Sequence, residues 1–411
     1  MSDYSVLLVT PRWARNGGVG AHVIASATAL ARHGFRVGVL AAQLESRERV
    51  PGVELLQAPA LFDRQAAPRV RAGTAVEFNA DVIHLHQMDH PEMVDWLRGS
   101  APVLVSAHGY TACASGLHYF RPGHECARGH GLGCVPQLLL RNCAHTRRPD
   151  RLPAAYERAT RGLEAMRRAD LAVSYSGAID RHLAANALQR RALVPLFSTV
   201  TPRSGSGHRE RRRVVFAGRV VSAKGVSVLV RAAHRLQGEI VVCGDGWQLE
   251  STRRLAQHLG VADRIDFKGW LPEDQIAEEL AQASVVAVPS LWPEPFGLVG
   301  IEAMAAGRPV VASATGGTTD WLHDGVNGVL VHPGDARGLA RALEELLDDP
   351  ERQSTMGLAG QRLVADRFSP ERHVAALERA YLRAGEHWRR ARPASERVTA
   401  TVGKPATGAS G

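Results

Sequence analysis

The chain has 411 residues, of which 45% are hydrophobic and 22% charged, and this composition is that of a globular protein long enough for two domains. Its 50 basic against 41 acidic residues give a formal net charge of +9, which favours anionic partners such as nucleotide phosphates. No apolar run approaches membrane-spanning length, and five cysteines do not make a secreted disulfide framework. We expect a cytoplasmic protein, with peripheral membrane contact left open. Aromatic residues, at 5%, are too few to favour a nucleic-acid partner.

The first 197 residues alternate short apolar strands with amphipathic helices, which predicts a Rossmann-like domain. A glycine-rich loop at 15–20 joins the first strand to a helix at 21–32, and such a loop lets the backbone approach a phosphate closely. Val23 takes the place of the third glycine of G-x-G-x-x-G, so a nicotinamide dinucleotide site is not supported. The strands that we expect in this half are 6–9, 37–40, 81–86, 103–106 and 171–174.

Histidines follow two of these strands at their carboxyl ends, where open α/β sheets bind ligands. Among the 18 histidines, His108 is therefore our candidate for an active-site role. For His84 and His86 two interpretations stand, an acceptor-binding role and the more common structural one, in which the imidazole pairs with backbone groups.

An irregular insertion at about 110–150 carries four cysteines and several histidines, and it is expected to shape a binding site beside His108. Four thiols can bind zinc tetrahedrally, but the gaps between these cysteines are long and no C-x-x-C pair occurs. Two interpretations therefore stay open. The cysteines are either free thiols that pack a loop, which is the favoured alternative, or a structural zinc site at Cys113, Cys126, Cys134 and Cys143.

A polar, basic stretch at 198–213 predicts the domain linker, and a second series of strands and helices follows at 214–369. The strands that we expect there are 214–217, 240–243, 265–268, 285–288, 310–313 and 329–331. A long amphipathic helix is expected at 370–390, and the small, polar residues 391–411 predict a disordered tail.

The stretch 293–302 in this second half predicts a ligand site. Two prolines stiffen the backbone around Glu294, and Glu302 lies about one turn into the helix expected at 298–306. Two carboxylates then flank a helix N-terminus whose free amides can bind phosphate, which suits a sugar that bears a diphosphate.

Arg219 and Lys224 share one strand-to-helix loop, and a basic pair there suits a diphosphate. Pre-placed cations stabilise the charge that develops on a leaving nucleoside diphosphate. No D-x-D sequence occurs, so an aspartate-held divalent metal is not indicated, and we expect no cofactor to be required for catalysis.

Taken in order, these features resemble the retaining glycosyltransferases of family 4, which have the GT-B fold. The E-x7-E signature at Glu294 and Glu302 is, by itself, moderately specific for this family. All the matching segments in this order are much more specific. The resemblance covers roughly residues 5–385. The other matching segments are 17–20, 81–86, 108–109, 218–225, 244–246, 289–290, 316–317 and 324–328.

The resemblance implies an α/β protein with two Rossmann-like domains that face an interdomain cleft, with a UDP- or GDP-sugar donor in the C-terminal domain and a hydroxyl acceptor in the N-terminal one. The helix at 370–390 would cross back to the first domain. Implied catalytic residues are His108, Glu294, Arg219 and Lys224, and implied acceptor residues are His84, His86 and His108. Implied donor-binding residues are Gly17, Gly18, Arg219, Lys224, Gly244, Asp245, Trp270, Leu271, Glu294, Phe296, Gly297, Leu298 and Glu302.

Two departures from the family pattern and several alternatives remain. Residues 193–199 replace an Asn-Gly-Val-Asp-like run, and Asp320 replaces a glutamate. The acceptor is expected to be a small molecule or a glycan. The alternatives are a peripheral membrane enzyme that acts on a lipid-linked or cell-envelope acceptor, and a nucleotide-sugar epimerase or phosphorylase on the same fold.

Overall fold

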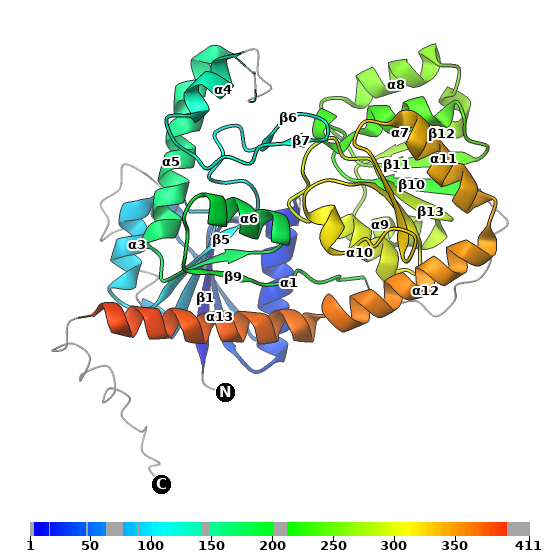
Figure 1. The fold of residues 1–411 in the computed structure, drawn as a ribbon. Helices are drawn as coiled ribbons and strands as arrows, with labels where there is room; N and C mark the ends of the chain where they lie inside the picture. Colours follow the sequence, from blue (N-terminus) through cyan, green and yellow to red (C-terminus); the bar gives the residue numbers. More distant parts are fainter. Residues whose placement is uncertain are drawn as a thin grey trace, which may run out of the picture.

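Two α/β units lie side by side in the computed structural model, each built around one parallel sheet (Figure 1). The structure describes residues 4–15, 17–46, 48–62, 77–88, 90–140, 143, 148–200 and 212–392. Most of the predicted linker 198–213 and nearly all of the predicted tail 391–411 lie outside these residues.

The N-terminal unit is organised around a sheet with the strand order β3-β2-β1-β4-β5-β8-β9, in which every pair is parallel. The central strands β4 and β5 are short and fully buried, and β1 is buried over its first six residues, as strands covered on both faces are. The predicted strands are present, and β3 and β9 at the two edges were not expected. The bounds are β1 Ser5–Trp13, β2 Arg36–Leu44, β3 Val53–Gln57, β4 Val82–His86, β5 Val103–Ala107, β8 Leu171–Ser174 and β9 Arg191–Leu193.

Helices cover both faces of this sheet, because alternate residues of β1 point into two different cores. Val6 and Leu8 pack in the core that contains α1, whereas Leu7 and Val9 pack in the one that contains α3 and α5. The helices and 3-10 turns are α1 Gly18–Arg32, η1 Pro59–Phe62, α3 Pro91–Arg98, α4 Cys134–Leu140, η2 Pro149–Arg151, α5 Leu152–Arg168 and α6 Gly177–Ala185.

The C-terminal unit repeats this plan with the strand order β12-β11-β10-β13-β14-β15, again all parallel. The first strand, β10, lies in the middle, so loops after β10 and β13 meet at one edge of the sheet. The strands are β10 Arg213–Ala217, β11 Glu239–Cys243, β12 Ile265–Gly269, β13 Val285–Val288, β14 Val310–Ser313 and β15 Gly328–Val331. The helices and turns are η3 Ser222–Lys224, α7 Val226–Ala233, α8 Leu249–His258, η4 Ala262–Arg264, α9 Glu273–Gln282, α10 Leu298–Ala305, η5 Gly317–Asp320, α11 Ala336–Leu347, α12 Pro350–Arg367 and α13 Pro370–Ala391.

The last helix, α13, leaves the C-terminal unit and runs along the N-terminal one (red in Figure 1). Ser369 caps its first turn by accepting a hydrogen bond from the amide of Arg372, and Pro370 is at its first position. Its buried face packs against α1, β5 and β8, and the indole of Trp388 donates to the carbonyl of Arg98 at 2.7 Å. Helix α13, the last described helix, is therefore part of the core of the N-terminal unit.

The insertion at 110–150 contains a small antiparallel hairpin, β6 Tyr119–Arg121 and β7 His124–Glu125, that points toward the C-terminal unit (Figure 1). Its chain is otherwise mostly turns and bends up to α4. Within the described ranges no helix is both long and apolar enough to cross a membrane.

Candidate functional site

An ion pair between Lys224 and Glu294 lies at the centre of the candidate site. The Lys224 ammonium donates to both carboxylate oxygens of Glu294, at 2.7 and 2.9 Å. Glu294 is 2% exposed, and it also accepts hydrogen bonds from the Ser290 hydroxyl and, at 3.1 Å, from the indole of Trp292. This buried carboxylate is therefore satisfied and held in one orientation by three donors.

The sequence brings these residues together through the order of the strands. Lys224 ends the turn η3 that follows β10, and Glu294 lies in the loop after β13, the strand paired with β10. Gly225 has φ +69°, and a Cβ there would lie 1.9 Å from the carbonyl oxygen of Pro289. Only glycine allows the two loops to touch at this point.

The loop of Glu294 is fixed from its other side by Gly316. Its backbone has φ +59°, and a Cβ would lie 2.3 Å from the carbonyl oxygen and 2.5 Å from the nitrogen of Glu294. The next amide, of Gly317, donates to the same carbonyl at 2.6 Å. The Gly-Gly pair is thus a backbone support for the carboxylate loop.

Helix α10 begins directly after this loop, with Gly297 at φ +88° before its first residue. The indole of Trp321 donates to the carbonyl of Phe296 at 2.6 Å and packs against Gly300, which fixes the direction in which the helix starts. The first amides of a helix have no intrahelical partner, so this terminus can bind an anionic group.

Glu302 lies one turn into α10 and is partly buried. Burial, together with the negative charge of Glu273, raises the pKa of its carboxyl to about 7. A carboxylate kept in a poorly solvated position at a structural cost is typical of a binding site.

This raised pKa predicts a pH-dependent gain of stability in Glu302→Gln. Below about pH 4.5 the carboxyl is protonated in both the folded and the unfolded chain, and between about 4.5 and 7 only the folded chain resists ionisation. The wild type therefore loses stability across this window, whereas the variant does not. We expect the melting temperature of Glu302→Gln to exceed that of the wild type at pH 8 and to equal it at pH 4. Glu278→Gln, an exposed change on α9, is the control, and a pH-independent difference would contradict the assignment.

The remaining donor-binding candidates lie at the ends of neighbouring strands, with more exposure. Arg219 and Asp245 are exposed, and Trp270 is 64% exposed after β12. A Cβ at Gly244 would lie 1.9 Å from the carbonyl oxygen of Gly218, so the loops after β10 and β11 are in contact. These side chains are on the surface, where they can contact a bound molecule.

The N-terminal unit contributes a network of neutral histidines. His86 Nδ1 lies 2.9 Å from His108 Nε2, and His84 bonds to Ser106 at 2.7 Å and to Tyr381 of α13 at 3.2 Å. Burial lowers the pKa of both His84 and His108 to about 3, so these rings are uncharged at neutral pH.

His84 and His86 are each 1% exposed, and both ring nitrogens of His84 already have partners. Contact between either residue and an acceptor requires the surrounding side chains to move. The hydrogen bonds of His84 orient its neighbours Ser106 and Tyr381. His108 is only partly covered, and its ring stacks on Tyr175 at 4.9 Å between centroids. Their acceptor roles stay predictions.

The two units meet around these residues. A Cβ at Gly109, next to His108, would lie 3.8 Å from Cγ of Pro295, so the histidine loop adjoins the loop of Glu294. Glu294 also contributes, after burial and Glu125, to the raised pKa of Tyr110. His108 of one half and the Lys224–Glu294 pair of the other thus lie at one junction.

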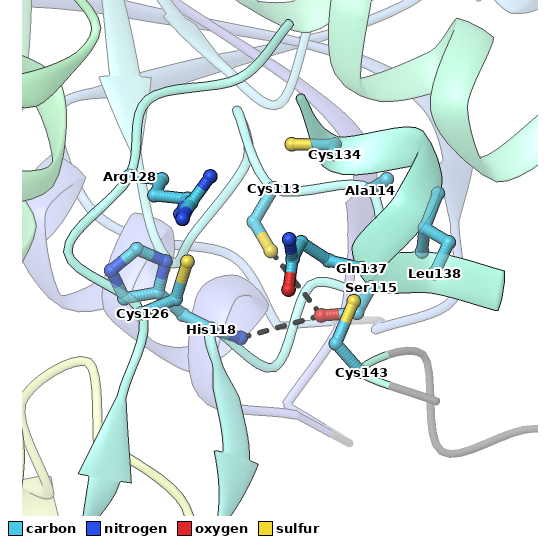
Figure 2. A pocket seen from close by; sticks show the side chains of 10 residues that line it. All are labelled: Cys113, Ala114, Ser115, His118, Cys126, Arg128, Cys134, Gln137, Leu138 and Cys143. Atoms are coloured by element: carbon cyan, nitrogen blue, oxygen red, sulfur yellow. Dashed lines mark hydrogen bonds between the residues drawn. The ribbon is translucent and has the colours of Figure 1, made fainter. Parts of the chain in front are cut away.

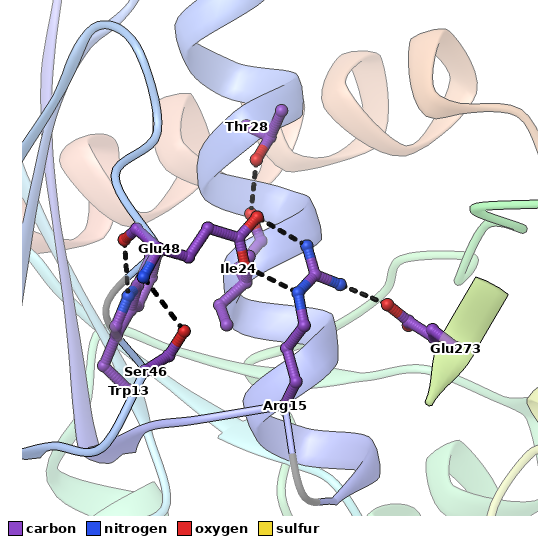
Figure 3. A network of polar contacts seen from close by, with 7 residues as sticks. All are labelled: Trp13, Arg15, Ile24, Thr28, Ser46, Glu48 and Glu273. Carbon is purple, nitrogen blue, oxygen red and sulfur yellow. Dashed lines mark hydrogen bonds and ion pairs between the residues drawn. The ribbon is translucent and has the colours of Figure 1, made fainter. Parts of the chain in front are cut away.

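Polar contacts join the units on several sides of this junction. Arg15 binds Glu48 of its own unit at 2.6 Å and also pairs with Glu273 at the start of α9 (Figure 3). Asp320 of η5 accepts from the amide of Gly177 at 2.6 Å. The asparagine of the glycine loop lies outside the described residues, whereas Gly17 and Gly18 are exposed, with open space around them.

The contacts of several residues at this junction were not predicted from the sequence. Ser290 and Trp292 complete the shell of Glu294, and Glu125 of the insertion accepts from Gly316. The two prolines around Glu294 were a usable signal for Trp292, which lies two positions away. No pattern indicated Glu125, because its partner is far along the chain.

Comparison with solved structures identifies the fold class. Sucrose-phosphate synthase from Thermosynechococcus elongatus is 23% identical, with a TM-score of 0.66, over 94% of this chain and 98% of that one. The HepE protein of Anabaena, solved in complex with UDP and glucose, is 19% identical, with a TM-score of 0.65, over 92% and 99%. The predicted α/β GT-B fold is confirmed.

The family follows from the sequence comparison. Residues 202–363 match the family model described as glycosyl transferases group 1. D-inositol 3-phosphate glycosyltransferase of Corynebacterium aurimucosum is 38% identical over 179 residues, 41% of this chain and 42% of that protein. A GDP-mannose-dependent alpha-(1-6)-phosphatidylinositol monomannoside mannosyltransferase of Mycolicibacterium smegmatis is 34% identical over 170 residues, 39% and 44%. The matches span less than half the length of these relatives. The predicted resemblance to family 4 glycosyltransferases is confirmed.

Proposed function

We propose that this chain is a retaining glycosyltransferase that moves a sugar from a nucleoside diphosphate donor to a hydroxyl group of an acceptor. The observation that carries the proposal is the Lys224–Glu294 pair, buried beside the N-terminus of α10 and next to the histidine loop of the other unit. A cation, the Glu294 carboxylate and helix amides lie together there, within the segment 202–363 that matches the glycosyltransferase family model.

In the proposed reaction the diphosphate lies against the start of α10, where helix amides and the cations Lys224 and Arg219 stabilise it. Negative charge grows on the leaving diphosphate as the glycosidic bond breaks, so a fixed cation lowers the barrier more than it tightens substrate binding. The acceptor oxygen attacks from the same face, and a phosphate oxygen of the leaving group takes the proton of the hydroxyl. This assignment uses positive charge from side chains and amides, without a divalent metal ion.

Two carboxylates orient the donor in this proposal. Glu302, whose carboxyl is partly buried, binds the ribose hydroxyls, and Glu294 contacts the transferred sugar. Gly17 and Gly18 close over the diphosphate, and Gly244, Asp245, Trp270 and Leu271 surround the base. His108, which is neutral at pH 7 because burial lowers its pKa to about 3, contacts the sugar or the acceptor as a hydrogen-bonding group.

The nature of the donor is supported by related proteins. HepE was solved with UDP and glucose, and the mycobacterial relative is GDP-mannose-dependent by name. We propose a UDP- or GDP-hexose as donor and a small polyol or glycan hydroxyl as acceptor.

Acceptor-dependent release of nucleoside diphosphate tests the function. The full chain is incubated with UDP- and GDP-sugars, with and without a panel of polyol acceptors that includes inositol phosphate, and free diphosphate is measured. We expect release that requires an acceptor, together with a product whose anomeric configuration, read by NMR, matches the donor. Conversion of the donor sugar without acceptor would favour an epimerase, and an inverted product would exclude the retaining mechanism.

A further inference from the structure

Four cysteines of the insertion surround one small cavity, although they lie far apart in the sequence (Figure 2). Cys113 follows the histidine loop, Cys126 follows β7, Cys134 begins α4 and Cys143 lies beyond that helix. All four are free thiols of intermediate exposure. The fold thus gathers nearly all of the cysteine of the chain, which has five such residues, at one place.

The four thiols line the same cavity of the insertion. Protonated sulfurs crowded in this way are poorly satisfied, because S–H is a weak donor and sulfur a weak acceptor. Cys113 contacts Ser115 at 3.2 Å, and Cys134 contacts the carbonyl of Gly129 at 3.8 Å.

The surrounding segment has little core to hold it in place. Its separate hydrophobic cluster has three buried members among the described residues, Ala114, Leu138 and Ala159. Apart from the short hairpin and α4, the chain from Gly109 to Leu140 is mostly turns and bends. Ordering so irregular a segment costs conformational entropy that so small a core does not offset. Structural zinc commonly supplies the missing stability in segments of this kind.

We propose that Cys113, Cys126, Cys134 and Cys143 bind one structural zinc ion. On binding, four S–H protons leave to solvent and four Zn–S bonds of about 2.3 Å form. The centre then has two net negative charges, and Arg128, which lines the same cavity, offers a compensating guanidinium (Figure 2). Tetrahedral sulfur coordination favours zinc or an iron–sulfur cluster over magnesium or calcium, which prefer oxygen ligands.

The sulfurs must draw together to form this site. Among the described residues, no group of three or more His, Cys, Asp and Glu side chains already has the spacing of a metal centre. Cys113 and Cys126 lie on described backbone outside the helices and strands, where few ladder or helix hydrogen bonds must break for them to move. His118 lines the cavity as well, but its ring stacks on Tyr110 at 4.4 Å between centroids, so we assign the four sulfurs as ligands.

A zinc ion here would also position the contact between the two units. Cys126 directly follows Glu125, whose carboxylate accepts from the Thr315 hydroxyl at 2.9 Å and from the amide of Gly316 at 2.8 Å. Gly316 in turn supports the backbone of Glu294. The metal therefore anchors a hairpin that contacts the loop supporting the proposed donor site. This part of the inference depends on the proposed function.

Metal analysis of the full chain, purified under reducing conditions without added chelator, tests the zinc site. We expect about one zinc per chain by mass spectrometry of the digested protein, which is the content of a single tetrahedral centre. Cys126→Ser and Cys134→Ser should lose the metal, and the matched control Cys243→Ser, which changes a buried cysteine of β11, should keep it. Iron in place of zinc, two disulfides in the intact mass, or a chain that neither contains zinc nor binds added zinc would overturn the proposal.

Hydrogen exchange distinguishes the effect of the metal from the effect of the hairpin contact. It does not depend on the folding of any cysteine variant. Removing zinc from the wild type with a chelator should increase amide exchange at 119–126 and at 315–317, and added zinc should reverse it. Glu125→Gln weakens the hairpin contact without touching a sulfur, so it should increase exchange at 315–317 while retaining the zinc. Unchanged exchange at both segments after zinc removal would contradict the anchoring role, whatever the outcome of the activity assay.

Discussion

Lys224→Met is expected to reduce kcat by about 10²- to 10³-fold, the usual consequence of removing one fixed group that stabilises developing charge. The same change leaves the carboxylate of Glu294, which is 2% exposed, without its cation. Losing one partner of a buried pair costs about 3 kcal/mol of unfolding free energy. Steady-state kinetics and urea unfolding measure the two effects separately.

A double-mutant cycle with Glu294→Gln shows whether the two residues act as a pair. Glu294→Gln alone should cost less stability than Lys224→Met, because the Lys224 side chain is 23% exposed and its ammonium can remain hydrated. The double variant should recover stability over Lys224→Met but no activity. Lys268→Met breaks another lysine–glutamate pair of the same domain, with Glu279, and should leave turnover unchanged. Independent, additive losses of stability at Lys224 and Glu294 would contradict the pairing.

Gly316→Ala is expected to reduce turnover by about 10²-fold, because an added Cβ displaces the backbone of Glu294 and errors of about 1 Å in a catalytic group have effects of this size. The new Cβ would lie 2.3 Å from the carbonyl oxygen of Glu294, a distance that no rearrangement of a side chain relieves. Affinity for the donor, measured by thermal shift with a nucleotide sugar, should fall as well.

Gly260→Ala is the matched control for this change. Gly260 has φ +66°, close to the +59° of Gly316, but a Cβ there has nothing within 4 Å. Both variants place an alanine at a positive φ, which strains the backbone, whereas only Gly316→Ala also forces the loops apart. Equal activity in the two variants would show that contact with Glu294 is not what Gly316 provides.

The centre of the site follows from the sequence because it depends on local patterns and on one rule of topology. Apolar strands at 214–217 and 285–288 predict a parallel sheet, and polar loops after such strands meet at one edge. Lys224 and Glu294 each lie in one of those loops, so their meeting is a consequence of strand order. The helix expected at 298–306 differs from the observed α10 by one residue at its end, because Gly297 and Gly307 mark its two ends.

The parts that were missed depend on contacts between distant segments. His84 was expected at a strand end, but its partner Tyr381 lies on α13, and no spacing in the sequence relates the two. Glu125 likewise has its partners near 315, and its chain has no regular periodicity. The edge strands β3 and β9 carry half-exposed side chains in place of buried runs, so they lack the hydrophobic signal that marked the central strands.

The path of α13 has a consequence for anyone who wishes to exchange N-terminal units between related proteins. A cut in the linker alone yields a first half whose Ser26, His84 and Arg98 have lost the His373, Tyr381 and Trp388 that complete them. A transplantable N-terminal unit is therefore discontinuous and consists of roughly the first 200 residues plus the final helix. Hybrids that splice in only the leading segment should be recovered as aggregates, and those that carry both pieces as monodisperse protein.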